Sequence, residues 1–385
     1  MADRYRAIAC FAAGAASVGA VVALCALLIS SHPKSLPSPL EAYSKTPNSV
    51  LRRLPYPPIH FIPGARDVAT PYGTVRLYEW GPETAQRKVL LLHGISGSCV
   101  VLLTLAETLV ADGCRVMLLD LFGRGWSGGP SDLPYDDRLY ASQIFMSLAS
   151  SPISWTGGDD GKFSIIGYSL GGGIAADFAS WFPNLIEDLV LIAPGGLMNS
   201  DWRSRMLYSG LVPEPRMKKI LRGRLLGSSN VAAAVSMLGP ALADEEGTGE
   251  APPEKTFLER VKNIDADAVV AWQLEHNPGF VPAFVSSIRF APTKYQHDRW
   301  RRLGEHVVAH KTAGLPQRFT NGNILLILGG QDSIIGPAEI VPDARDVLGD
   351  DQLEVKVYDD AGHSVGMSHG AEIANVLLRR WGAAP

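Results

Sequence analysis

The stretch SIIGYSLGGG, residues 164–173, places one serine between glycines directly after an apolar run. Residues 162–169 are typical of a buried strand, and residues 170–182 are typical of a helix. A serine at a strand-to-helix turn, with glycine two positions before and two after, is the pattern of a nucleophile elbow. Gly167 and Gly171 avoid the clashes that side chains would cause at so sharp a turn. The pattern predicts that Ser169 is an exposed nucleophile.

Strands and helices alternate on both sides of this turn. The expected strands are 74–80, 88–94, 115–121, 162–169, 185–194, 323–332 and 353–363, and the expected helices are 99–112, 135–149, 170–182, 337–348 and 370–382. Near-continuous apolar strands alternating with helices predict the α/β class, with a mostly parallel sheet covered by helices on both faces.

The alternation stops near residue 197 and resumes near residue 321. We therefore expect a core in two parts, 59–197 and 321–385, interrupted by a mainly helical cap insertion at 198–320. Within this insertion, residues 215–227 carry apolar positions at helical spacing among basic ones. Such a helix could lie on an anionic membrane surface, but a cap helix with its apolar side inward is favoured. Residues 299–302, RWRR, are expected to be solvated surface.

The N-terminal part differs from the rest because residues 7–30 contain no charged side chain. As a helix they would span about 36 Å, which is enough to cross a hydrocarbon core of about 30 Å. We therefore predict a single-pass membrane anchor within residues 1–31, followed by a Pro/Ser-rich linker at 32–58. The alternatives are a cleaved signal peptide, whose apolar segment is usually shorter and which would make the protein secreted, and a buried globular helix.

Composition excludes several classes of protein. The 385 residues carry a formal net charge of only −4, so a basic nucleic-acid binder is not expected. The 4 cysteines are too few for a disulfide scaffold, and no Cys-x-x-Cys or Cys/His spacing suggests a metal site. We expect neither a metal nor an organic cofactor.

A serine hydroxyl needs a base to remove its proton. His363 directly follows the strand predicted at 353–363, where a base is expected, whereas the alternative His369 begins the last helix. The base in turn needs an anion that fixes its tautomer.

Asp332, just past the preceding strand, is the favoured anion, although an aspartate there could also simply cap the next helix. Asp359 and Asp360 are alternatives that are less well placed. The chain order Ser169, Asp332, His363 is the order found with the nucleophile elbow.

The developing oxyanion needs two backbone N–H donors. Leu170, the residue after the nucleophile, is expected to supply one. The other is expected from Ile95, because His93 and Gly94 allow a tight turn after the early strand. His93 is interpreted as a structural histidine rather than a base.

Five blocks together resemble the α/β-hydrolase superfamily. They are HGISGS at 93–98, DLFGRGWS at 120–127, GYSLGG at 167–172, GGQDSI at 329–334 and AGHS at 361–364. The resemblance covers about 60–197 and 320–382, and it implies that 120–127 is a structural turn. A serine at position 169 distinguishes the chain from haloalkane dehalogenases and epoxide hydrolases of that superfamily, which have aspartate there.

These observations predict a membrane-anchored serine hydrolase that cleaves a small-molecule carboxylic ester, with lipid-like esters such as monoacylglycerols favoured by the predicted anchor. Two alternatives stay open at this point. One is a hydrolase of the same fold acting on a thioester, an amide or a carbon–carbon bond. The other is a non-catalytic binding protein, which would normally lack one of the three residues Ser169, Asp332 and His363.

Overall fold

The computed structural model describes residues 34–47, 62–156, 161–198, 206–226, 266–314 and 319–382. The apolar stretch 7–30, predicted to be a membrane anchor, lies outside these ranges. Within them, every helix is too short or too polar to cross a bilayer.

The centre of the molecule is an eight-stranded sheet with the strand order β10-β9-β8-β7-β4-β5-β3-β2. Its strands are β2 (Ala65–Thr70), β3 (Gly73–Trp80), β4 (Lys88–Leu92), β5 (Arg115–Leu119), β7 (Phe163–Tyr168), β8 (Ile186–Ile192), β9 (Ile324–Gly329) and β10 (Leu353–Tyr358). The six strands from β10 to β5 are parallel, and β3 and β2 join antiparallel at one edge. The predicted α/β class with a mostly parallel sheet is confirmed.

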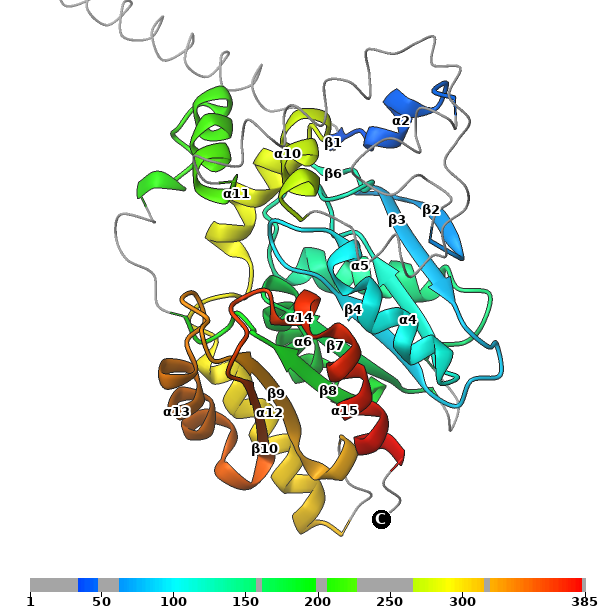
Figure 1. The fold of residues 1–385 in the computed structure, drawn as a ribbon, viewed down its shortest axis with the longest axis vertical. Coiled ribbons are helices and arrows are strands. Elements are labelled where there is room, and N and C mark those ends of the chain that lie inside the picture. The colour runs from blue at the N-terminus through cyan, green and yellow to red at the C-terminus, as the bar shows by residue number, and fades with distance from the viewer. Residues whose placement is uncertain are drawn as a thin grey trace, which may run out of the picture.

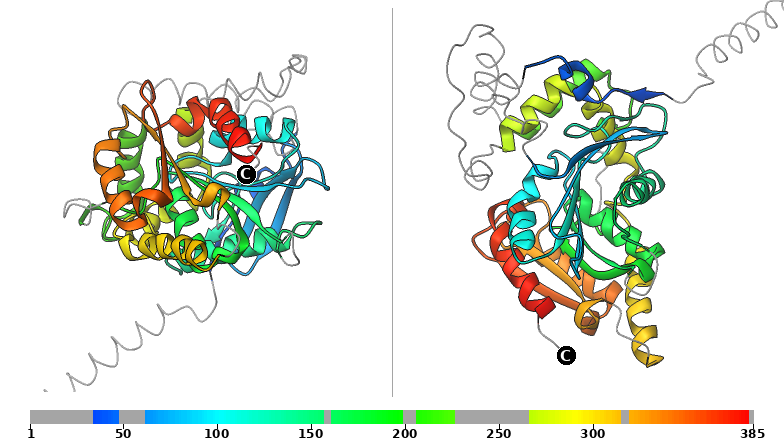
Figure 2. Two further views of the ribbon diagram at one scale, coloured as in Figure 1. Left: turned by 90° about the horizontal axis from the view of Figure 1, so that it is seen from below. Right: turned by 90° about the vertical axis from the view of Figure 1, so that its right-hand side faces the viewer.

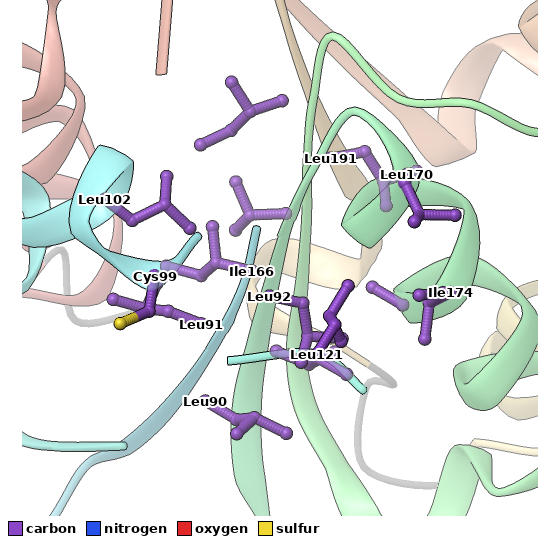
Figure 3. Packing of buried hydrophobic residues seen from close by; sticks show 14 of the residues in the cluster. Leu90, Leu91, Leu92, Cys99, Leu102, Leu121, Ile166, Leu170, Ile174 and Leu191 are labelled. Carbon is purple, nitrogen blue, oxygen red and sulfur yellow. The ribbon is translucent and has the colours of Figure 1, made fainter. Parts of the chain in front are cut away.

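Helices cover both faces of this sheet (Figures 1 and 2). On one face, α4 (Leu103–Ala111), which continues the 3₁₀ turn Cys99–Leu102, packs beside α14 (Val365–Ser368) and α15 (Gly370–Gly382). The other face carries α5 (Asp137–Ala149), α6 (Leu170–Trp181), α12 (His297–Thr312) and α13 (Pro337–Leu348). Apolar side chains of the central strands, among them Leu91 and Ile166, are fully buried between the layers (Figure 3). This burial on both faces explains their unbroken hydrophobic sequence.

Two further helices, α10 (Ala266–His276) and α11 (Phe280–Phe290), lie above the end of the sheet where α6 begins (Figure 1). We call them the cap helices. Residues 214–226 also form a helix whose Met217 and Leu221 are buried. Its Lys218 and Arg222 both pair with Glu275 of α10. The favoured interpretation of this basic segment, with the apolar side inward, agrees with the structure.

The remaining helix of the predicted cap range, α12, packs on the core helices α6 and α13 instead. The expectation that residues 299–302 are solvated surface holds for the exposed Arg301 but is wrong for Trp300 and Arg299. Trp300 is buried, and Arg299 makes an ion pair of 3.2 Å with Asp137 of α5 and stacks over Trp181 of α6. The arginine-rich sequence thus attaches α12 to its neighbours.

Part of the predicted linker 32–58 lies on the globular body. β1 (Ser35–Leu36) pairs with β6 (Gly129–Pro130), and the short helix α2 (Pro39–Tyr43) follows. Ser38 caps α2 by accepting from the amide of Leu40, and its hydroxyl donates to the carbonyl of Trp126 at 2.5 Å. Tyr43 packs edge-on against Trp126 and lies beside Trp272 of α10. The prolines of this segment prevent a long helix. They still allow the short helix α2, because Pro39 occupies its first position, where proline is tolerated.

Candidate active site

The turn between β7 and α6 places Ser169 in a backbone conformation that residues with side chains rarely adopt, with φ 54° and ψ −115°. A Cβ atom at Gly167 would lie 2.1 Å from the carbonyl oxygen of Gly171, and one at Gly171 would lie 2.2 Å from that of Leu92. Neither approach allows a side chain. Both glycines of the predicted elbow are therefore required by the close contact of the turn with its neighbours.

The structure brings together the three side chains that the sequence singles out. His363 Nε2 lies 3.0 Å from Ser169 Oγ, and His363 Nδ1 lies 2.8 Å from Asp332 Oδ2. They come from the loops after β7, β9 and β10, strands far apart in the sequence whose carboxyl ends meet at one edge of the sheet.

The carboxylate of Asp332 is held on both oxygens. Its Oδ1 accepts hydrogen bonds from the amides of Ile334 at 2.8 Å and Ile335 at 2.9 Å. Burial by itself would raise the pKa of Asp332, but the hydrogen bonds from His363 and from these amides lower it below its ordinary value. The group is therefore an anion, and His363 donates Nδ1–H to it. His363 Nε2 is thus left to accept the proton of Ser169.

The loops that carry the acid and the base are bonded to each other through their backbones. The amide of Gly330 donates to the carbonyl of Tyr358 at 2.7 Å, and that of Gln331 donates to Ala361 at 2.8 Å. A Cβ atom at Gly329 would lie 2.3 Å from the carbonyl oxygen of Gly362. Main-chain contacts thus fix the separation of Asp332 and His363.

Tyr168 contacts His363, and no pattern in the sequence singles it out. Its hydroxyl donates to the carbonyl of His363 at 2.9 Å, and its ring lies 5.6 Å from the imidazole between centroids. Burial raises the pKa of this phenol, so it remains a proton donor to that carbonyl. The sequence shows only that Tyr168 precedes Ser169, at a position of the elbow motif that accepts many side chains.

The alternative base and acids have other partners. His369 lies 3.3 Å from Asp360 through Nε2 and 2.9 Å from Ser368 Oγ through Nδ1. The carbonyl of Asp359 accepts from the Gln331 side chain at 3.1 Å. Within the described residues none of their side chains forms a hydrogen bond or ion pair with Ser169 or His363, so the geometry favours His363 and Asp332.

The backbone N–H groups of Leu170 and Ile95 make no backbone hydrogen bond outside the helices and strands of the described residues. The N–H of Leu170 begins α6, where the positive end of the helix dipole favours an anion. The turn containing Ile95 lies close to the nucleophile, because a Cβ atom at Gly94 would be 3.2 Å from Ser169 Cβ. These are the two donors expected for an oxyanion.

His93 determines the direction of the Ile95 N–H group. The amide of Leu121 donates to His93 Nε2 at 2.9 Å, so the hydrogen is on Nδ1, which donates to the carbonyl of Gly94 at 2.7 Å. Full burial lowers the pKa of His93 to about 3, which keeps it neutral. Because C=O and N–H point in opposite directions across a trans peptide, the bond to Gly94 turns the next N–H, that of Ile95, the other way. These bonds give His93 a structural place in the core, and they orient the N–H group of Ile95.

A cleft of about 600 Å³ lies beside the loops that follow β8 and β9. Its apolar wall includes Leu197, Met198 and Ile335, and Glu339 and Asp343 lie at it from α13. Ile335 donates its amide to Asp332, and Leu197 comes two residues after Gly195, whose amide donates to the carbonyl of Ser169. The cleft thus adjoins the loop that carries Asp332, and its wall combines apolar side chains with the two carboxylates of α13.

No group of three or more His, Cys, Asp or Glu side chains in the described ranges is arranged to hold a metal ion. Cys99 and Cys114 are buried thiols in the core.

Comparison with known proteins identifies the fold independently. The model of the alpha/beta hydrolase family matches residues 89–376. A serine hydrolase-like protein from Danio rerio is 30% identical over 132 residues, which cover 34% of this chain and 38% of that protein. The chain therefore matches only about a third of the length of that relative.

Solved structures resemble most of the chain at low identity. A membrane phospholipase A, described as a novel bacterial virulence factor, superposes with a TM-score of 0.54 at 18% identity and covers 96% of this chain and 97% of its own. Naproxen esterase from Bacillus subtilis gives a TM-score of 0.51 at 19% identity, with 88% and 96% covered. At such identities the similarity establishes the fold.

Proposed function

We propose that this chain, which belongs to the alpha/beta hydrolase family because that family's model matches well over half of its residues, hydrolyses carboxylic esters through an acyl-enzyme on Ser169. The observation that carries the proposal is the pair of hydrogen bonds made by His363, 3.0 Å to Ser169 and 2.8 Å to Asp332. Nucleophile, base and orienting anion are then within reach of one another.

In the first half-reaction, Ser169 Oγ attacks the ester carbonyl carbon while its proton passes to His363 Nε2. The carbonyl oxygen becomes an oxyanion, which accepts from the N–H groups of Leu170 and Ile95. Asp332 stabilises the imidazolium that forms. The bond from carbon to the leaving oxygen then breaks, and the alcohol leaves with the proton from His363.

In the second half-reaction, His363 Nε2 takes a proton from a water molecule, whose oxygen attacks the acyl carbon. The bond to Ser169 Oγ breaks, the serine regains its proton from His363, and the carboxylic acid leaves. The net reaction consumes one water, and every proton passes through the same imidazole nitrogen.

For the substrate, we propose a lipid-like ester such as a monoacylglycerol. The apolar side chains of Leu197, Met198 and Ile335 in the wall of the cleft support an apolar acyl or alcohol group. The uncharged stretch 7–30 supports a position at a membrane, where such esters reside. The acidic Glu339 and Asp343 at this cleft disfavour an anionic group there.

The test uses the full chain with a fluorophosphonate probe and a series of p-nitrophenyl and monoacylglycerol esters of increasing acyl length. We expect labelling and turnover to disappear in Ser169→Ala and to persist in Ser368→Ala, a serine whose hydroxyl bonds to His369 Nδ1 and to the carbonyl of Ser364. A folded wild type that resists the probe would refute the proposed nucleophile. Turnover of vinylogous diketones but not of esters would replace ester hydrolysis by carbon–carbon bond hydrolysis.

The proposed anchor is tested separately by alkaline carbonate extraction of membranes that contain the full chain. We expect the protein to stay in the membrane pellet. Full-length protein in the supernatant would rule out a spanning segment, and a mature N-terminus beyond residue 30 would identify a cleaved signal peptide instead.

A further inference from the structure

The cap helices are attached to the turn after β4 by buried polar side chains. Gln273 of α10 is fully buried, and its Nε2 donates to the carbonyl of Ser96 at 3.1 Å. Its Oε1 accepts from the amide of Gly125 at 2.7 Å. One side chain of the cap thus bridges the turn after β4 and the turn after β5.

Arg124 forms a second connection between the same parts. It is also fully buried, and its Nε donates to the carbonyl of Ile95 at 3.2 Å. The other end of its guanidinium donates to Ser287 Oγ of α11 at 2.9 Å and to the carbonyl of Ala283 at 3.3 Å. The guanidinium is thereby held between the second cap helix and the turn after β4.

Three successive carbonyls of this turn therefore accept hydrogen bonds from side chains: Gly94 from His93, Ile95 from Arg124, and Ser96 from Gln273. The turn lies between two glycines, Gly94 and Gly97, so little else restricts the rotation of its peptide planes. Ile95 and Ser96 are half-buried. Loss of Arg124 or Gln273 therefore leaves a carbonyl that is satisfied by water or by rotation of its peptide, and this removes a restraint on the turn directly after the peptide that carries the Ile95 N–H.

We propose that Gln273 and Arg124 are positioning residues for the oxyanion donor Ile95, so that the cap helices control the geometry of the oxyanion hole. This inference rests on the proposed hydrolysis at Ser169. Neither side chain touches the reacting atoms. Each acts through the carbonyl that it holds, and Gln273 makes the position of α10 part of the catalytic geometry.

The variant Gln273→Glu tests the inference against Asn277→Asp, a matched control at the end of the same helix. Asn277 Nδ2 donates to the carbonyl of Gly125 at 3.0 Å, and its Oδ1 accepts from the amide of Gly279 at 2.8 Å. Both substitutions keep the acceptor oxygen, remove one donor to a core loop and introduce a carboxyl at a buried position. Only Gln273 bonds to the turn that carries Ile95.

We expect Gln273→Glu to lower kcat by about 10-fold to 100-fold with an unchanged KM. The affinity for a trifluoromethyl ketone ester analogue, whose hemiketal oxyanion uses the same hole, should fall by the same factor. Asn277→Asp should leave both within about threefold. Equal losses in the two variants, or a loss that appears in KM alone, would overturn the inference.

Deuterium exchange of a peptide covering residues 93–98 gives a readout that needs no substrate. We expect faster exchange there in Gln273→Glu than in the wild type or in Asn277→Asp, and unchanged exchange would overturn the inference. If exchange at residues 93–98 is faster in Gln273→Glu but the wild type hydrolyses none of the esters, the proposed function fails. The attachment of the cap to the turn would still stand.

Discussion

Replacing Asp332 by asparagine tests how the structure selects the tautomer of His363. In the wild type one carboxylate oxygen accepts from the amides of Ile334 and Ile335, and the other accepts from His363 Nδ1. Asparagine has only one oxygen. If that oxygen stays on the two amides, its NH₂ group faces His363 and requires Nδ1 to be an acceptor. The imidazole hydrogen then moves to Nε2, which can no longer accept the proton of Ser169.

The opposite orientation of the asparagine amide would restore the tautomer, but it sets the NH₂ group against two backbone donors. Leaving those amides unpaired costs about 1–3 kcal/mol each. At a total of at least about 2 kcal/mol, the restoring orientation is populated in no more than about one molecule in thirty. The activity should therefore fall at least about 30-fold through the tautomer alone. With the loss of the anion beside the imidazolium, we expect about 10⁴-fold, or about 5.5 kcal/mol in the activation free energy.

The assay is kcat for a p-nitrophenyl ester at pH 7 to 8, with thermal denaturation to establish that the variant is folded. Asp360→Asn is the control, because Asp360 is an exposed carboxylate that pairs with the other histidine, His369, and its loss should change kcat less than about twofold. If folded Asp332→Asn keeps more than a tenth of the wild-type kcat, Asp332 does not orient the base. A large loss in the control would instead assign the base to His369.

Three other predictions concern stability. Ser169→Gly and Ser169→Ala should both be inactive. The free energy of unfolding of the glycine variant should be about 1 kcal/mol higher than that of the alanine variant, because relief of the positive φ exceeds the entropy cost of glycine. Equal denaturation midpoints would contradict this prediction. Gly171→Ala should lose several kcal/mol or fail to fold because of the carbonyl of Leu92, whereas Gly223→Ala, with open space around it, should not be destabilised. Burial without a hydrogen-bond partner raises the pKa of Glu107 to about 7. The folded protein therefore loses stability as pH rises from about 4.5 through 7, because ionisation of this carboxyl is easier in the unfolded chain. Glu107→Gln should stabilise the protein more at pH 8 than at pH 5, and an equal effect at both pH values would be contrary to this assignment.

The sequence is sufficient to predict the sheet and the residues beside Ser169 because these follow from local rules. Strands buried on both faces must be apolar along their whole length, as in LLIL at 325–328. The elbow needs glycine where the structure leaves no room for Cβ. β2 was not predicted, because it lies at the sheet edge, where its alternate side chains are exposed and its sequence ARDVAT is largely polar.

What the sequence could not predict are contacts whose partners are distant and chemically ordinary. A buried glutamine such as Gln273 cannot be distinguished in a sequence from an exposed one. Its role depends on the position of two loops that lie 148 and 177 residues earlier in the chain. The same is true of Tyr168 below His363, and of Tyr43, whose ring meets Trp272 across more than 200 residues. Periodicity describes which face of an element is buried, but it does not identify what that face meets.

The two halves of the site are held by different kinds of bond, and this difference has a consequence for substrate choice. Backbone hydrogen bonds such as Gln331 to Ala361 join the loops of the acid and the base, and these bonds do not depend on the cap. The turn that carries Ile95 is held by side chains, two of which link it to α10 or α11. Substitutions in the cap can therefore change both the shape of the substrate site and the alignment of an oxyanion donor while the nucleophile and base remain in place. If the cap is replaced by one that lacks Gln273 and the partners of Arg124 in α11, the chimera should bind a new ester but hydrolyse it slowly.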